Sequence, residues 1–196
     1  CGPTVALLGA SNIALYSLVY TPLKRVTPRN TEVGAVVGAI PPLMGWASAG
    51  APLLHPSALS LFLLLFLWQM PHFYALAWRH RKDYANAGYE MISRRDPTGS
   101  ITAKNNLAYT AALSALPLFA ALTGVTGHMF AVEGTAVNLY MLHLARKFKQ
   151  DPSDANARAL FLATLWYLPL LMAFMVFHSK AWIKDDQEEA QPASQA

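Results

Sequence analysis

The sequence predicts an all-α membrane protein, a polytopic bundle of six transmembrane helices. Hydrophobic residues make up 54% of the 196 residues and charged residues only 13%, too few for a surface that faces water. Four stretches contain no Asp, Glu, Lys or Arg, and each approaches or exceeds the roughly 20 residues that a helix needs to cross a bilayer. These stretches are residues 1–23, 33–78, 105–132 and 159–179. The second is long enough for two spans.

Charge clusters and Pro/Gly breaks divide these stretches into helices. The first predicted helix ends just before Lys24, and a polar cap at residues 30–32 precedes the second. Uncharged breaks at 51–56 and 123–127 separate later helices, and basic clusters bound the others. The six predicted helices cover residues 4–21, 33–50, 57–78, 105–122, 128–145 and 159–178. Internal prolines such as Pro71 predict kinks, because neighbouring helices in a membrane bundle satisfy the freed carbonyl groups.

The basic residues lie in alternate loops. Thirteen of the fifteen Lys and Arg residues fall in the loops 22–32, 79–104 and 146–158, which leaves only Lys180 and Lys184. The positive-inside rule places these three loops in the cytoplasm of a bacterium or the matrix of a mitochondrion, with both termini on the other side. The same basic residues do not line an aromatic, polar face, so nucleic-acid binding is disfavoured.

The loop 79–104 carries the strongest candidate chemistry. Long loops between packed helices are often functional, and this one begins with a lone carboxylate, Asp83, among four potential cations: Arg79, His80, Arg81 and Lys82. Such a cluster suits a diphosphate, which the cations neutralise while the carboxylate holds a bridging Mg²⁺. A solvated cluster that meets anionic lipid head groups is the alternative.

Two further patterns support a site at this face. On a continued helix, His72, Arg79 and Asp83 would share one face, because they are spaced by seven and four residues. A histidine inside an apolar span is a functional candidate by default, although hydrogen bonding within the bundle would also explain His72. Lys24 and Arg25 reach the same side, where they either join the site or anchor the topology.

Three passages resemble the UbiA-type membrane prenyltransferases, and within them the protohaem IX farnesyltransferases, or haem O synthases. The first runs from Tyr20 to Arg25 (YTPLKR), and the second from Asn30 to Trp46 (NTEVGAVVGAIPPLMGW). The third runs from Trp68 to Trp78 (WQMPHFYALAW) and leads into Lys82-Asp83-Tyr84 and Ala87-Gly88. The first half of the chain carries the specific resemblance, and its wording is closer to mitochondrial members than to bacterial ones.

The resemblance implies a nine-helix domain of which this chain, over residues 1–184, has six spans. It implies that the first three helices are absent, together with the Asp-rich loop that supplies the main Mg²⁺ ligands, and that this chain alone is inactive. Residues 185–196 read as a disordered polar tail. Because no basic region precedes the first apolar stretch, we expect no signal peptide and a chain that starts within a longer protein or has been processed.

The resemblance also assigns residues. It implies that Asp83 is the remaining acidic, metal-binding and catalytic position, since Ala87 stands where other UbiA-type enzymes have a second aspartate. His72 is a candidate catalytic or haem-side residue. The expected diphosphate contacts are Tyr20, Lys24, Arg25, Arg79, Arg81 and Lys82.

The implied reaction transfers the farnesyl group of farnesyl diphosphate to a vinyl group of protohaem IX (haem b), with Mg²⁺ bridging the diphosphate. The expected location is the mitochondrial inner membrane, with the basic loops facing the matrix, or a bacterial inner membrane. Haem A synthase or oxidase assembly proteins are possible partners. Two alternatives stay open: a related prenyltransferase with an aromatic, quinone-precursor acceptor, and a non-catalytic membrane scaffold or transporter, which would not need Lys24, Arg25 and Asp83 to converge.

Overall fold

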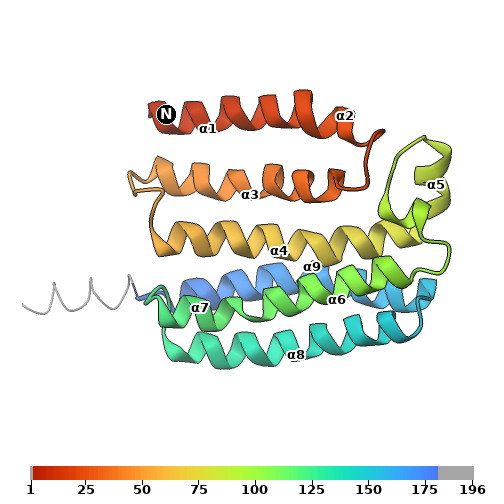
Figure 1. The fold of residues 1–196 in the computed structure, drawn as a ribbon. Coiled ribbons are helices and arrows are strands. Elements are labelled where there is room, and N and C mark those ends of the chain that lie inside the picture. The colour runs from red at the N-terminus through yellow and green to blue at the C-terminus, as the bar shows by residue number, and fades with distance from the viewer. Residues whose placement is uncertain (1, 181–196) are drawn as a thin grey trace, which may run out of the picture.

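Six helical rods lie side by side in the computed structural model, which describes residues 2–180. The rods are listed here in chain order: α1 (Pro3–Ala14) with η1 (Leu15–Tyr20) and α2 (Thr21–Leu23), α3 (Asn30–Ser48), α4 (Pro56–Arg79), α6 (Ser100–Ser114) with α7 (Leu116–Leu122), α8 (His128–Gln150) and α9 (Asp154–Phe177). Two short helices, α5 (Arg81–Asn86) and η2 (Ile92–Arg95), lie in the loop between α4 and α6. The predicted all-α bundle is confirmed (Figure 1), whereas the predicted tail 185–196 falls outside the described residues.

The predicted helices are found at their expected places with different ends. The helix predicted to end at residue 145 continues to Gln150, and the next begins at Asp154, so the predicted loop 146–158 is largely helical. The basic residues Lys147 and Lys149 occupy the last turn of α8, where cations are stabilised by the helix dipole. By length and composition, three described stretches qualify as membrane spans: Pro3–Leu23, Pro56–Arg79 and Asp154–Phe177. Six spans therefore stay a prediction.

Helix α4 is the centre of the bundle, with α3, α6 and α9 packed around it. Small and apolar side chains such as Ala75 and Leu64 are fully buried. Polar side chains join the helices where they meet: the Asn106 amide donates to the Pro71 carbonyl oxygen at 2.9 Å, and the Tyr167 hydroxyl donates to Asn138 at 2.8 Å. In an apolar surrounding such bonds are needed to satisfy polar groups.

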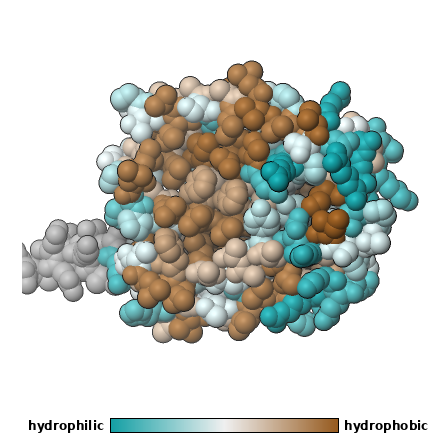
Figure 2. Space-filling view, in the orientation of Figure 1, coloured by the Kyte–Doolittle hydropathy of each residue, from teal (hydrophilic) through white to brown (hydrophobic). Residues whose placement is uncertain are grey.

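The outer surface is apolar over most of the helix length. No residue of α1 is buried, and large apolar side chains such as Leu18, Leu162 and Phe177 are exposed. Figure 2 shows hydrophobic residues across the middle of the bundle and hydrophilic residues gathered at the end where α5 lies. This distribution is the one expected of a bundle surrounded by lipid.

The three basic loops meet at that hydrophilic end (Figure 1). The backbone N–H of Glu90, in the long loop, donates to the carbonyl oxygen of Lys24 in the first loop at 2.7 Å. Arg81, also in the long loop, pairs with Asp154 of the third at 2.5 Å. These contacts place the predicted basic residues on one face of the molecule, and this convergence was expected from their alternation along the chain.

Candidate active site

A pocket opens at the basic end between the end of the first rod, α3, α4 and α5. It has a volume of about 150 Å³. The residues that line it are mainly aromatic and polar: Tyr20, Lys24, Asn30, Thr31, Gly34, Gln69, Phe73, Tyr84, Tyr89 and Met91. Two of the eight predicted site residues, Tyr20 and Lys24, are therefore brought together here.

Lys24 is the cation of this pocket. Its ammonium nitrogen lies 4.5 Å from the ring centre of Tyr20 and 5.7 Å from that of Tyr16, within the range of a cation–π attraction. The aromatic rings thus hold the ammonium group without neutralising it. Its neighbour Arg25 is exposed and does not line the pocket. Both cations were predicted as diphosphate contacts, but only Lys24 lies in the pocket.

The floor of the pocket depends on close helix packing. A Cβ atom on Gly34 would lie 2.7 Å from the Tyr20 ring, and one on Gly38 would overlap the Gln69 amide. The Gln69 amide donates to the carbonyl oxygens of Ala35 and Leu65 at 3.2 and 3.0 Å, which fixes its position. Glycine at 34 and 38 therefore allows α3 to approach both the first rod and α4.

Two hydroxyl-bearing residues of the lining, Thr31 and Tyr84, differ in their surroundings. The Thr31 hydroxyl oxygen is enclosed and has no hydrogen-bond partner among the described residues; such orphaned groups are uncommon in native proteins. Burial, and secondarily the neighbouring Tyr89 ring, raises the pKa of Tyr84. The Tyr84 hydroxyl therefore stays protonated at neutral pH and can donate a hydrogen bond to an anion. Neither Thr31 nor Tyr84 was predicted as a site residue from the sequence.

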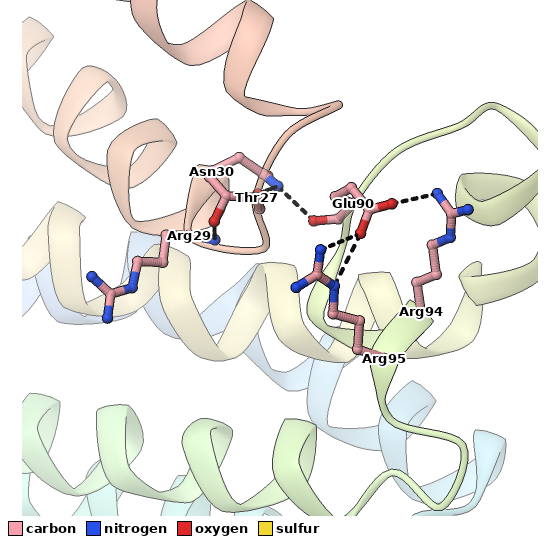
Figure 3. Close-up of polar contacts among 6 residues, drawn as sticks. All are labelled: Thr27, Arg29, Asn30, Glu90, Arg94 and Arg95. Atoms are coloured by element: carbon pink, nitrogen blue, oxygen red, sulfur yellow. Dashed lines mark hydrogen bonds and ion pairs between the residues drawn. The ribbon is translucent and has the colours of Figure 1, made fainter.

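Tyr89 and Met91 form one wall of the pocket. Glu90, between them in the chain, makes polar contacts with Asn30, Arg94 and Arg95 (Figure 3), and we call this group the latch. The Glu90 carboxylate pairs with Arg94 at 2.7 Å and with Arg95 at 2.9 Å. The backbone carbonyl oxygen of Glu90 accepts a hydrogen bond from the Asn30 side-chain amide at 3.0 Å. Glu90 therefore ties the long loop to the start of α3. Glu90 precedes η2 and lies outside any helix, so the helical spacing rule does not indicate this pair from the sequence.

Removing the charge of Glu90 should loosen this loop. In Glu90→Gln the backbone bonds remain while both ion pairs are lost, at about 1 kcal/mol of local stability. We expect trypsin to cleave after Arg94 and Arg95 roughly fivefold faster in membrane preparations, because local opening exposes the loop. Glu133→Gln is the matched control. It also removes one carboxylate from an ion pair, the one with His178 at 2.9 Å, but Glu133 lies on α8 and not in this loop. Equal cleavage rates in all three proteins would contradict the latch.

The predicted shared face of His72, Arg79 and Asp83 is correct for the first two, which both contact Phe161 of α9, and wrong for Asp83. Helix α4 ends at Arg79, and His80 has non-helical backbone angles (φ −104°, ψ 23°) before α5 begins. The break turns Asp83 away from the axis of α4. Its side chain is 79% exposed and accepts from the ring nitrogen Nδ1 of His80 at 3.2 Å, next to Tyr84 in the pocket wall.

The predicted diphosphate contacts in this loop are divided. Arg81 stacks on Trp78, with the guanidinium carbon 4.4 Å from the ring centre, and pairs with Asp154. Arg79 lies over the Phe161 ring of α9 at 5.6 Å. Both therefore face α9 and not the Lys24 pocket. Lys82 is exposed.

His72 also faces α9. Its Nδ1 atom lies 2.8 Å from the Thr164 hydroxyl, and its ring stacks on Trp68 with centres 5.0 Å apart. His72 is absent from the lining of the Lys24 pocket, although its neighbour Phe73 is part of it.

The donor set for a metal is small. Among residues 2–180 no group of three His, Cys, Asp or Glu residues could hold a metal ion. Mg²⁺ needs only one or two carboxylates when substrate phosphates complete its shell. The exposed carboxylate of Asp83, beside the pocket, fits that requirement as a single ligand.

Sequence comparisons identify related proteins. Residues 1–168 match the UbiA prenyltransferase family. The mitochondrial protoheme IX farnesyltransferase of Yarrowia lipolytica is 42% identical over 95% of this chain and 43% of its own length. The human mitochondrial protein of the same name is 41% identical over 89% of this chain and 39% of its own. A protoheme IX farnesyltransferase of Solibacter usitatus is 38% identical over 86% and 58%.

The chain spans about two fifths of the length of these mitochondrial relatives, and no solved structure matches it. The family match covers most of the residues that form the bundle and all of those that line the Lys24 pocket. The chain belongs to the UbiA prenyltransferase family.

Proposed function

We propose that this chain forms part of a protohaem IX farnesyltransferase, which transfers the farnesyl group of farnesyl diphosphate to a vinyl group of haem b. The observation that carries the proposal is the Lys24 pocket, in which one unneutralised cation and several aromatic rings lie together at the basic end of the bundle. The names of relatives about 40% identical supply the substrate class.

The pocket suits departure of a diphosphate. The allylic C–O bond breaks and its electron pair leaves with the diphosphate, whose growing charge the Lys24 ammonium stabilises. Tyr84 and Thr31 line the same pocket, and their hydroxyls would donate hydrogen bonds to these oxygens. Tyr20, Tyr89 and Phe73 also line the pocket, and aromatic rings attract an allylic cation.

The remaining bond changes balance with water as the only further reactant. A vinyl carbon of the porphyrin bonds to the farnesyl carbon, and water adds to the second vinyl carbon and loses a proton. The product carries a hydroxyethylfarnesyl group. Mg²⁺ bound between Asp83 and the diphosphate would neutralise part of the leaving group's charge.

The cellular setting follows from the same relatives. Several of these relatives are named as mitochondrial proteins, and this chain has helices apolar enough to cross a membrane. Both observations favour a mitochondrial membrane as its location. We propose the inner membrane, with the three basic loops toward the matrix. Oxidase assembly proteins are the partners that this product implies.

The test is farnesyl transfer in membranes that contain the natural protein carrying residues 1–196, made in a host without its own farnesyltransferase. With farnesyl diphosphate, Mg²⁺ and haem b, we expect a haem product heavier by one farnesyl group and one hydroxyl group. An aromatic quinone precursor offered in place of haem should remain unmodified. Prenylation of that precursor, with haem untouched, would overturn the proposed acceptor.

Asp83→Asn should raise the Mg²⁺ concentration needed for half-maximal turnover by roughly tenfold, because a charged metal ligand becomes neutral. The folded yield should change little, since Asp83 is exposed. Asp151→Asn, at another carboxylate in the loop between α8 and α9, should leave the Mg²⁺ requirement unchanged. Magnesium titrations after treatment with a chelator measure the effect. Equal losses of turnover and folded yield in Asp83→Asn would indicate a structural role instead.

A further inference from the structure

A second basic cavity opens at the same end of the bundle, between α4 and α9. It has a volume of about 320 Å³ and is lined by Arg79, Asp154, Ala155 and Arg158. It shares no residue with the Lys24 pocket. Asp154 is already bound to Arg81, and no ion pair of Arg79 or Arg158 is found within residues 2–180. The cavity therefore offers two cations to an anionic ligand.

An aromatic surface continues from this cavity into the bundle. The Arg79 guanidinium lies over the Phe161 ring at 5.6 Å, and the Phe161 and His72 rings are 4.8 Å apart. Trp68 stacks on the other side of His72 at 5.0 Å. His72 is two helical turns below Arg79, about 10 Å along α4. The order is therefore cations at the water face, then flat rings and an imidazole at membrane depth.

The hydrogen bonds of His72 fix its tautomer. The Thr164 hydroxyl donates its only hydrogen to the Phe161 carbonyl oxygen at 2.5 Å. It can therefore only accept from His72, whose Nδ1 lies 2.8 Å away and must carry the hydrogen. The Nε2 atom is left with a bare lone pair. It has no hydrogen bond among the described residues and is not one of the enclosed polar atoms.

On the basis of the proposed function, we infer that the face of α4 and α9 from the Arg79 cavity to His72 is the haem-binding site, where His72 Nε2 ligates the iron and Arg79 and Arg158 bind the propionates. A haem carries its two carboxylates on one edge of an apolar ring, which matches this sequence of groups. A metal-bound histidine commonly donates its second ring N–H to a fixed acceptor, the role that Thr164 has here. A bare imidazole lone pair at membrane depth is costly without such a ligand.

The two sites adjoin at α4. Phe73 lines the Lys24 pocket, His72 faces α9, and their rings meet edge to face at 5.2 Å. Consecutive residues of a helix point about 100° apart, so the cavities flank one helix and do not lie on opposite sides of it.

The test is haem titration of the natural protein, purified in detergent without farnesyl diphosphate, followed by the Soret band. The wild type should bind ferric haem b with the spectrum of a nitrogen-ligated iron. In His72→Asn the amide can still donate to Thr164 but cannot reach the iron, so we expect loss of that spectrum and at least tenfold weaker binding. Thr164→Val should weaken binding by roughly tenfold through the second ring nitrogen.

Arginine variants test the other end of the ligand. Arg79→Gln and Arg158→Gln should each weaken haem b binding by roughly tenfold, but should not change binding of the haem dimethyl ester, which lacks the carboxylates. Lys24→Ala, in the other pocket, should bind haem like the wild type. A wild-type spectrum and affinity in His72→Asn would overturn the inference even if farnesyl transfer is found. A wild type that neither binds nor farnesylates haem would overturn both this inference and the proposed function.

Discussion

Lys24→Ala should lower kcat/KM for farnesyl diphosphate by about 100-fold, the usual cost of removing one preorganised group that stabilises developing negative charge. The aromatic rings of Tyr16 and Tyr20 hold the ammonium group in place, 5.7 and 4.5 Å from its nitrogen, without cancelling its charge. The cation is therefore fully available to the leaving diphosphate. Initial rates of haem farnesylation in membranes, measured over a range of farnesyl diphosphate concentrations, give the effect.

Arg25→Ala is the matched control. It removes the adjacent positive charge from the same loop, but Arg25 is exposed and outside the pocket lining. Its loss should cost only a few-fold through long-range attraction, and this cost should disappear at higher salt. The defect of Lys24→Ala should persist in salt. Equal defects in the two variants would mean that the pocket around Lys24 is not the diphosphate site.

For Lys24 and Arg25, the sequence predicts the loop in which they lie but not which of the two side chains enters the pocket. Their position at the end of a helix on the basic face was predicted from hydropathy and charge alone. Which of the two enters the pocket depends on the register of the rod before them, and η1, Leu15–Tyr20, is a π-helix. A wider turn of this kind rotates every following side chain, and no residue pattern in the segment indicates it.

Contacts outside the local sequence also explain why Arg79 and Arg81 of the long loop face α9 and not the Lys24 pocket. Arg79, Arg81 and Asp83 are neighbours in sequence, and a helix continued through them would have kept Arg79 and Asp83 on one face. The break at His80 and the packing of α9 against α4 send both arginines to Phe161 and Asp154. These are tertiary contacts over seventy residues of sequence, which local periodicity does not contain. The all-α bundle and its basic end, by contrast, follow from composition and from the alternation of loops.

The largest effect on stability is expected from Gly99→Ala. Gly99 precedes α6 with φ +77°, a conformation that costs other residues roughly 1–2 kcal/mol. An added Cβ would also lie 2.6 Å from the Cβ of Pro152 and 2.7 Å from the Trp78 ring. Trp78 is buried and carries the Arg81 guanidinium on its face, so it cannot move aside without disturbing the ion pair with Asp154. Such overpacking costs about 1–3 kcal/mol more.

Gly124→Ala separates these two causes, because Gly124 has nearly the same backbone angle, φ +76°, and nothing within 4 Å of an added Cβ. Thermal unfolding in detergent should show a modest loss for Gly124→Ala and a loss larger by the overpacking cost for Gly99→Ala. The difference between the variants then measures how tightly Gly99 joins Trp78 at the end of α4 to Pro152 before α9, next to the Arg79 cavity. If both variants lose the same stability, the backbone angle alone requires glycine at residue 99. An added Cβ would then fit beside Trp78 and Pro152 without a steric cost.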